Sequence, residues 1–314
     1  MRQLLVTGAD GFVGRWLVQE ARDQGWAVTA AVGPGGAAPE TWLRAGRGAA
    51  VPWFEADITS DTGRARLAEV EADAVVHLAA VSSGAAARQD PEGAMQVNAM
   101  ATVGLLEALW GAGRRPKFLF VSTGEVYGAG HDGPIPEDAP LQPVSPYAAS
   151  KFAAEPAVLD MAEAGGMEAV IARAFPHTGP GQSTAFVLPA FAARLWEAKR
   201  LGEREIAVGN LNVIRDFLDV RDVVRAYLLL LERGQAGKCY NVASGVGQQL
   251  RDCFVRLAGM VGVNAVPRED ASLVRPVDIP VLIGDATKLK AATGWQPTID
   301  FEQTLQDLLD AQAH

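Results

Sequence analysis

The N-terminal residues contain the feature that most constrains the fold. Leu4-Leu5-Val6 predicts a short buried strand, glycines follow at positions 8, 11 and 14, and apolar residues with helical spacing follow from Trp16. In such a strand–turn–helix unit the glycines permit a tight turn, close approach of a pyrophosphate to backbone amides, and close packing of helix on strand. The sequence therefore predicts a dinucleotide-binding turn. Its candidate cofactor contacts are Gly8, Asp10, Gly11, Phe12, Val13 and Gly14.

Strands and helices alternate along the following residues. Buried strands are predicted at 27–32, 51–57, 74–80, 118–121 and 169–174, with helical segments between most of them. This alternation predicts an α/β fold, a doubly wound parallel sheet of the Rossmann type. We expect a dinucleotide-binding domain over residues 1–174, to which 213–245 return. Residues 175–212 and 246–314 are expected to form a smaller, C-terminal substrate-binding lobe.

Composition limits the classes of partner. The 314 residues are 49% hydrophobic and 21% charged, as in ordinary globular proteins. The net charge of −9 gives no overall attraction to nucleic acid or to an anionic membrane, so we expect neither as a partner. Cys239 and Cys253 form no metal-binding or disulfide pattern, and no metal site is expected. A strand begins at residue 4 and no apolar run could span a bilayer, which favours a cytoplasmic protein.

Several polar and small residues follow predicted strands, at the sheet edge where ligands bind. Asp57 and Ile58 could bind and cover an adenine, although Asp57 could also cap the helix that follows it. His77 lies within a buried strand and is interpreted as a hydrogen-bonded core histidine. The other candidates here are Leu78, Ala79 and Ala80 for the cofactor and Ser83 for the substrate.

The end of the second predicted strand bears on the choice of cofactor. Many NAD-binding folds carry an acid there that holds the adenosine ribose. This chain has Val32 followed by Gly33, so no acid would repel a 2′-phosphate. The sequence therefore favours NADP(H), with NAD(H) possible. Arg15, Arg44 and Arg47 are either partners of that phosphate or ordinary surface charges.

Tyr147 and Lys151 are spaced for joint chemistry. Four residues apart on a helix, their side chains share one face. A nearby positive charge favours the phenolate, which makes a tyrosine useful in the proton transfers of carbonyl and alcohol chemistry. Thr123, just after the strand at 118–121, offers a hydroxyl at the ligand-facing end of the sheet.

Together, the GxxGFVG turn, Thr123 and the Tyr147–Lys151 pair resemble the extended short-chain dehydrogenase/reductase superfamily, in its nucleotide-sugar branch. The resemblance covers essentially the whole chain. It implies that Tyr147 is the catalytic acid/base and that Thr123 hydrogen-bonds the reacting oxygen. It also implies that Lys151 lowers the pKa of Tyr147 and holds the nicotinamide ribose.

The second half narrows the resemblance. Residues 177–182 (HTGPGQ), 208–211 (VGNL), 215–217 (RDF) and 275–280 (RPVDIP) are similar to the GDP-4-keto-6-deoxy-D-mannose reductases and the related GDP-mannose 4,6-dehydratases, with spacing that favours the reductases. The resemblance implies that Arg215 and Arg275 grip a sugar-nucleotide diphosphate, for which a structural ion pair is the alternative. Further substrate contacts are implied for His177, Val187 and Asn210, and for Asp278 on a sugar or ribose hydroxyl.

Two positions depart from these relatives. Pro176 replaces the usual Asn of a Phe-Asn-His loop, which removes a side-chain amide and a backbone N–H. Gly124 stands where one dehydratase group has an Asp before its Glu. Glu125 is retained, is counted among the candidate catalytic and substrate-binding residues, and keeps dehydration chemistry possible.

The resemblance implies an NAD(P)H-dependent oxidoreductase that reduces the C4 ketone of a GDP-4-keto-6-deoxyhexose to GDP-D-rhamnose or GDP-6-deoxy-D-talose. The alternatives are a GDP-mannose 4,6-dehydratase or a nucleotide-sugar 4-epimerase. A non-enzymatic dinucleotide sensor is disfavoured because Thr123, Tyr147 and Lys151 are all present. Related enzymes pair through two helices of each subunit, and the helices expected at 91–113 and 147–165 are apolar enough for such a four-helix homodimer interface.

Overall fold

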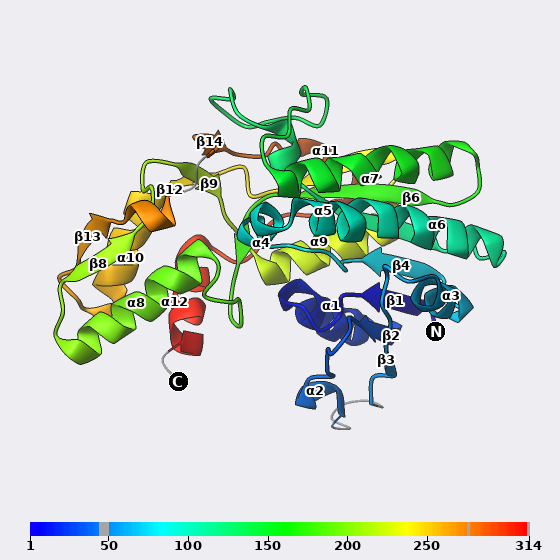
Figure 1. The fold of residues 1–314 in the computed structure, drawn as a ribbon, viewed down its shortest axis with the longest axis horizontal. Coiled ribbons are helices and arrows are strands. Elements are labelled where there is room, and N and C mark those ends of the chain that lie inside the picture. Colours follow the sequence, from blue (N-terminus) through cyan, green and yellow to red (C-terminus); the bar gives the residue numbers. More distant parts are fainter. Residues whose placement is uncertain (44–49, 275–276, 313–314) are drawn as a thin grey trace.

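The computed structural model describes residues 1–43, 50–274 and 277–312. At its centre, seven parallel strands lie in the order β11-β6-β5-β4-β1-β2-β3 (Figure 1). The chain runs outward from β1 in one direction through β2 and β3, and in the other through β4, β5 and β6. This order confirms the doubly wound, Rossmann-type sheet. The strands are β1 Gln3–Thr7, β2 Ala27–Val32, β3 Trp53–Glu55, β4 Ala74–His77, β5 Lys117–Thr123, β6 Ala169–Ala174 and β11 Lys238–Val242.

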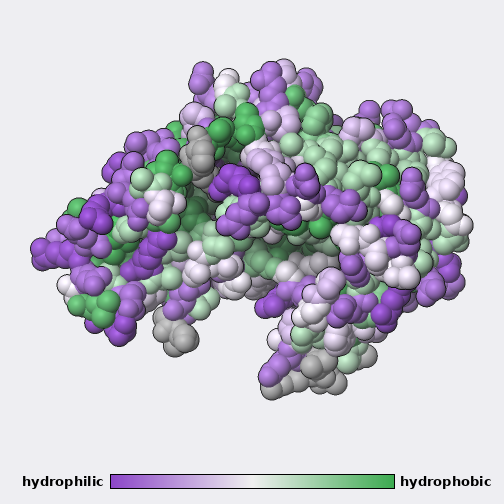
Figure 2. Space-filling model, viewed as in Figure 1, coloured by the Kyte–Doolittle hydropathy of each residue, from purple (hydrophilic) through white to green (hydrophobic). Residues whose placement is uncertain are grey.

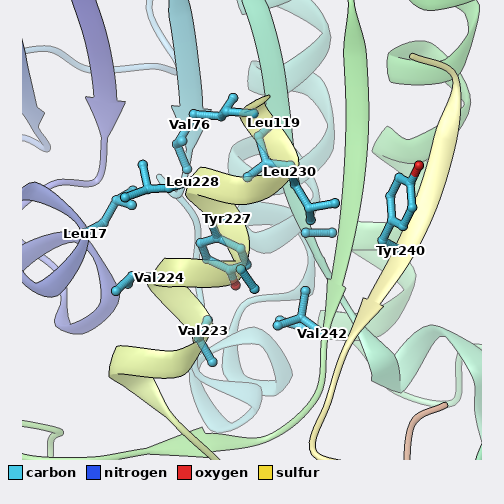
Figure 3. Packing of buried hydrophobic residues seen from close by; sticks show 14 of the residues in the cluster. Leu17, Val76, Leu119, Val223, Val224, Tyr227, Leu228, Leu230, Tyr240 and Val242 are labelled. Atoms are coloured by element: carbon cyan, nitrogen blue, oxygen red, sulfur yellow. The ribbon is translucent and has the colours of Figure 1, made fainter. Parts of the chain in front are cut away.

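Helices cover both faces of the sheet. One face carries α1 (Phe12–Asp23), α9 (Val220–Arg233) and α11 (Thr287–Thr293), and the other carries α3 (Asp61–Glu69), α6 (Ala101–Gly111) and α7 (Pro146–Glu163). Figure 3 shows how α9 fills the first face: Tyr227, Leu228 and Leu230 pack towards strand residues such as Val76 and Leu119. Burial of this apolar face holds α9 on the sheet.

A second, smaller body has its own core. It consists of α8 (Val187–Leu201), β8 (Glu205–Val208), α10 (Leu250–Val261), β13 (Val266–Glu269) and α12 (Phe301–Gln312), and we call it the lobe. Phe191 and Phe254 meet edge to face at its centre, with ring centroids 5.4 Å apart. Figure 1 shows the lobe to one side of the sheet. The domain boundaries given above stay a prediction; within the range 246–314, α11 packs against α9 and β11.

Short strands and helices complete the fold. A three-stranded sheet is formed by β12 (Gly247–Gln249), β9 (Ile214–Asp216) and β14 (Val281–Leu282), and β7 (His177–Thr178) pairs with β10 (Leu218–Asp219). The remaining short helices are α2 Glu40–Leu43, α4 Gly84–Gln89, α5 Pro91–Met95, and the 3-10 turns Gly124–Tyr127 and Ala271–Leu273. No helix among the described residues is both long and apolar enough to cross a membrane.

The helix expected over 91–113 is interrupted at Asn98. A π-helical turn, Gln96–Met100, separates α5 from α6. The buried Asn98 side chain accepts a hydrogen bond from Val81 N (2.8 Å) and donates to Val81 O (3.1 Å) and Ser150 Oγ (2.9 Å). These bonds tie the segment after β4 to α7, and such π turns are frequent near functional sites.

Candidate active site

A cavity of about 960 Å³ lies between the carboxyl ends of the sheet strands and the lobe. In Figure 2 the surface is hollowed between these two parts, with hydrophobic side chains inside the hollow. Its size suits a small-molecule site. The structure brings all the predicted site residues that it describes to this cavity. They are Gly8, Asp10, Gly11, Phe12, Val13, Gly14, Asp57, Ile58, Leu78, Ala79, Ala80, Ser83, Thr123, Glu125, Tyr147, Lys151, His177, Val187, Asn210, Arg215 and Asp278.

Three arginines named from the sequence lie outside the described residues: Arg275 of the substrate site, and Arg44 and Arg47 as partners of a 2′-phosphate. Arg15 is exposed on α1, and its Nε donates to Asp10 O (2.7 Å). The roles of all the site residues stay predictions; their common position is what the structure shows.

The glycine turn has the geometry of a phosphate cradle. Gly8 has φ +64°, and a Cβ there would lie 2.7 Å from Ala79 N. A Cβ at Gly14 would lie 2.4 Å from Gly8 O, so the start of α1 packs directly on the turn. Within the described residues no side chain caps α1, whose N-cap is Gly11. The first N–H groups of α1 are thus available to an anion, and the turn fits a dinucleotide pyrophosphate.

Asp57 does not cap the helix after it. Ser60 caps α3 by accepting from Gly63 N (3.0 Å). Asp57 Oδ1 instead accepts from the hydroxyl (2.6 Å) and the backbone N–H (2.9 Å) of Thr59, and these bonds lower the pKa of Asp57. The capping role considered for Asp57 was therefore wrong, because Ser60, three residues later, is the N-cap. The carboxylate at the cavity wall is consistent with the predicted adenine contact.

The candidate catalytic group forms where β5 ends beside the start of α7. Ser145 caps α7 through Ala148 N (3.1 Å), and Pro146 occupies the first turn, so Tyr147 is fixed at the helix entrance. The hydroxyl of Thr123 lies close enough to Tyr147 to lower the pKa of the phenol. The sequence predicted a lowered pKa for Tyr147, and this was wrong for the structure. Burial and the Glu125 carboxylate raise the pKa of Tyr147 by more than Thr123 lowers it. The phenol is therefore protonated at neutral pH.

Lys151 lies one turn further along α7. Its side chain is 3% exposed, and Nζ lies 4.6 Å from the centre of the Phe120 ring. Burial lowers the pKa of Lys151 to about 7, although the carboxylate of Glu155 acts in the opposite direction. The charge on this lysine is therefore sensitive to its neighbours near neutral pH.

His77 is the core histidine that the sequence predicted. Its Nδ1 lies 2.8 Å from Thr7 Oγ1, and its Nε2 lies 3.0 Å from Thr102 Oγ1. Because Thr102 donates to Asn98 O, its oxygen accepts from Nε2–H, and the ring is the neutral Nε2–H tautomer. Burial, assisted by the charge of Lys151, lowers the pKa of His77 to about 3.

The predicted diphosphate ligand Arg215 forms an ion pair. Its NH2 group lies 2.6 Å from Asp278 Oδ1, and its NH1 group donates to Ile279 O (2.6 Å) and Ile214 O (2.9 Å). This is the structural ion pair considered as the alternative. Both side chains nevertheless line the cavity, so a part in substrate binding is compatible with the pair.

The loop after β6 places a histidine against the cofactor turn. The ring of His177 stacks on that of Phe12, with centroids 6.4 Å apart and planes within 8°. His177 Nδ1 donates to Phe175 O (2.9 Å), and burial lowers the pKa of the imidazole. Pro176 lines the cavity next to it, and its carbonyl accepts from Leu218 N (3.0 Å).

Comparison with known proteins agrees with this geometry. The family model described as GDP-mannose 4,6 dehydratase matches residues 5–308. The chain belongs to this family. GDP-6-deoxy-D-mannose reductase of Pseudomonas aeruginosa is 38% identical over 76% of this chain and 79% of the relative, and a GDP-mannose 4,6-dehydratase of Vibrio cholerae is 30% identical over 82% and 79%. The predicted membership of the nucleotide-sugar branch is confirmed.

Solved structures of the same superfamily superpose closely. RMD from Pseudomonas aeruginosa, complexed with NADPH, has a TM-score of 0.86 at 34% identity and covers 100% of this chain and 99% of its own. A UDP-glucose 4-epimerase of Thermotoga maritima with UDP-glucose has a TM-score of 0.87 at 29% identity, with 98% of each chain covered. The expected fold is therefore shared by reductases and epimerases.

Two basic residues at the cavity were not predicted. Arg88 of α4 lines it near Glu125, and Arg194 of α8 lines its lobe end, where its NH1 group donates to Ala207 O (2.7 Å). Neither helix carries a sequence motif that marks a ligand site, and only the packing of those helices turns the side chains towards the site. Ser272 and Leu273 were missed for the same reason: the 3-10 turn that carries them has no sequence motif.

Proposed function

We propose that this protein reduces the C4 ketone of a GDP-4-keto-6-deoxyhexose with NADPH, giving GDP-D-rhamnose or GDP-6-deoxy-D-talose. The observation that carries the proposal is that Thr123, Tyr147 and Lys151 line one cavity together with the dinucleotide turn. The reductase and the NADPH complex among its relatives support the same reading.

The chain's own residues account for the proton chemistry. When bound, NADPH supplies a hydride. Tyr147 donates its phenolic proton to the oxygen of the ketone, and Thr123 holds a second hydroxyl beside it, so the charge developing on that oxygen meets two positioned groups. Charged Lys151 would hold the nicotinamide ribose and favour the phenolate that remains after proton transfer.

NADPH is the proposed cofactor because β2 ends at Val32 and is followed by Gly33, so that no acid stands there. Asp10 opposes this preference, because its carboxylate reaches the turn after β2, where a 2′-phosphate would lie. A Cβ at Gly36, in that turn, would be only 2.5 Å from Asp10 Oδ2. The relatives include complexes with NADPH and with NAD. We expect a higher kcat/KM for NADPH than for NADH, and we expect Asp10→Asn to increase that ratio; a ratio below one would contradict the preference.

A dehydratase is the second candidate, and Glu125 favours it. Its carboxylate lines the cavity and is close enough to Tyr147 to raise the pKa of the phenol. The dehydratase type with Asp before this Glu does not fit, because a Cβ at Gly124 would lie 2.9 Å from the Phe175 ring.

One comparison separates the two. Purified protein is incubated either with GDP-4-keto-6-deoxymannose and NADPH, or with GDP-mannose and no added reductant. NADPH consumption and a C4 alcohol seen by NMR are expected in the first mixture. Formation of a 4-keto sugar in the second would favour the dehydratase. Keto sugars with dTDP and UDP test the guanine base, and the NMR coupling constants of the product decide its configuration at C4.

We include a homodimer and a cytoplasmic location in the proposal. α5, the π turn and α6 lie beside α7 on one face of the sheet (Figure 1), and Met95, Met100 and Trp110 expose 37%, 57% and 40% of their surface there. A second copy covering this face would bury these side chains. Sedimentation of Met100→Glu should then show a shift towards monomer; a wild-type chain that sediments only as monomer would contradict the dimer.

A further inference from the structure

We propose that Glu155, with Arg173, forms a buried charge pair that sets the charge of Lys151, so that Glu155 is a positioning residue for the catalytic group. The proposal rests on the proposed function for the role of Lys151. Neither residue lines the cavity, and neither was singled out from the sequence.

Glu155 and Arg173 are both buried, and every nitrogen of the guanidinium group donates a hydrogen bond. Glu155 and Arg173 are 2% and 4% exposed. Arg173 NH2 lies 2.7 Å from Glu155 Oε2 and Arg173 Nε lies 3.1 Å from Oε1, so the guanidinium grips both carboxylate oxygens. The remaining NH1 group donates to Tyr127 Oη (3.0 Å) and Glu137 O (3.1 Å). A buried pair fixed in this way has a defined charge and orientation.

The carboxylate is also linked to both halves of the catalytic group, by its charge to Lys151 and by a hydrogen bond to the residue before Thr123. Glu155 follows Lys151 by four residues on α7, so the two side chains share one helix face. Glu155 Oε1 accepts from Ser122 Oγ (2.6 Å), and Ser122 directly precedes Thr123 at the end of β5. One carboxylate thus connects the helix that carries Tyr147 and Lys151 with the strand that carries Thr123.

The other groups that face Lys151 make its titration depend on the charge of Glu155. Tyr147 and Glu155 lie on its own helix; His77 faces it from β4 as a neutral ring, and Phe120 faces it from β5. From β6, Arg173 adds a positive charge beyond Glu155. Loss of the Glu155 charge therefore leaves two buried cations, Lys151 and Arg173. Loss of the Arg173 charge leaves Lys151 with an uncompensated carboxylate. The two changes should move the titration of Lys151 in opposite directions.

This sign reversal can be measured directly. In protein with lysine labelled by ¹³C at Cε, the Lys151 signal is assigned with Lys151→Arg and titrated with and without NADPH. We expect Glu155→Gln to lower the midpoint by about one pH unit or more, and Arg173→Gln to raise it. The double variant should lie between them. Glu163→Gln, an exposed substitution on the same helix, is the matched control and should leave the midpoint unchanged.

A merely structural pair would give a different result: lower stability in both single variants without opposite shifts, and this would overturn the proposal. If Glu155→Gln does not fold, Arg173→Gln must still raise the midpoint, and a constant midpoint overturns the proposal as well. Glu155→Asp keeps the charge and should restore a midpoint near that of the wild type.

The same variants connect the pair to turnover. The high-pH limb of kcat/KM should move to lower pH in Glu155→Gln and to higher pH in Arg173→Gln. The NMR titration needs no sugar substrate. Opposite NMR shifts in a protein that reduces none of the keto sugars would therefore support the charge pair and reject the proposed function.

Discussion

The cofactor side and the substrate side of the cavity are built in different ways. On the cofactor side, Gly8, Gly11 and Gly14 lie within seven residues, and Tyr147 and Lys151 lie one helical turn apart. On the substrate side, Arg215 of β9 is held by Asp278, which lies 63 residues away in the chain, in the segment before β14. Local backbone geometry therefore fixes the first set of residues, whereas long-range pairing fixes the second. Substitutions should separate these two kinds of positioning.

The largest effect is expected at Tyr147. Tyr147→Phe removes the proton donor but keeps the ring, so kcat should fall by about 10²–10⁴-fold while NADPH still binds. Steady-state kinetics and a fluorescence titration with NADPH measure the two quantities. Tyr240→Phe is the control, because that buried hydroxyl accepts from Gln235 N (3.1 Å) away from the cavity. Unchanged turnover in Tyr147→Phe would reject the catalytic assignment.

Gly8→Ala tests the local geometry of the cofactor side. An alanine at φ +64° is strained by about 1–2 kcal/mol, and its Cβ would also meet Ala79 N at 2.7 Å. Gly25 is a matched control, since it has φ +84° with no atom within 4 Å of its Cβ position. We expect both alanine variants to lose stability in urea unfolding, but only Gly8→Ala to weaken NADPH binding, by about tenfold or more. Equal binding in the two variants would show that the close contact with Ala79, after the end of β4, is unimportant.

These local features are also the ones that the sequence predicted best. The doubly wound parallel sheet follows from the alternation of strand and helix patterns along the chain. The glycine turn and the face shared by Tyr147 and Lys151 follow from residues that lie close together in the sequence. The interruption at Asn98 was missed, because a π turn arises from bonds to Val81 and Ser150, which lie far along the chain. The lowered pKa expected for Tyr147 was wrong for a related reason: the sequence shows the lysine nearby but not the extent of burial.

Arg215→Gln tests the substrate side. If the guanidinium binds the diphosphate, its loss removes charge-assisted hydrogen bonds worth about 1.5–3 kcal/mol, and KM for the sugar nucleotide should rise by about 10–100-fold. Asp278→Asn keeps the arginine and breaks only the charge pair, so its KM should change less. If both variants lose stability and neither changes KM, Arg215 and Asp278 are a structural ion pair and no more.

Sequence motifs identified single residues of the substrate side but did not predict how these residues contact one another. The motifs identified Arg215 and Asp278 separately, whereas their ion pair depends on the parallel pairing of β9 with β14. Arg88, Arg194 and the Glu155–Arg173 pair had no motif at all. Their positions follow from how α4, α7, α8 and β6 pack, and single-sequence patterns do not contain that information.

The smallest expected effect is at Pro176, where the resemblance led us to expect an Asn. Pro176→Asn restores a backbone N–H and a side-chain amide at the cavity wall, and Pro176→Ala restores the N–H alone. One neutral hydrogen bond contributes about 0.5–1.5 kcal/mol, so KM for the sugar nucleotide should fall by about 2–10-fold in the Asn variant and by less in the Ala variant. Both variants should lose up to about 1 kcal/mol of stability through the freer unfolded chain. Equal KM values in the two would assign the effect to the backbone N–H, and an unchanged KM in both would mean that this substrate is bound without the missing amide. In that case other residues of the pocket bind the substrate, and Arg88 or Arg194 would be the next residues to substitute.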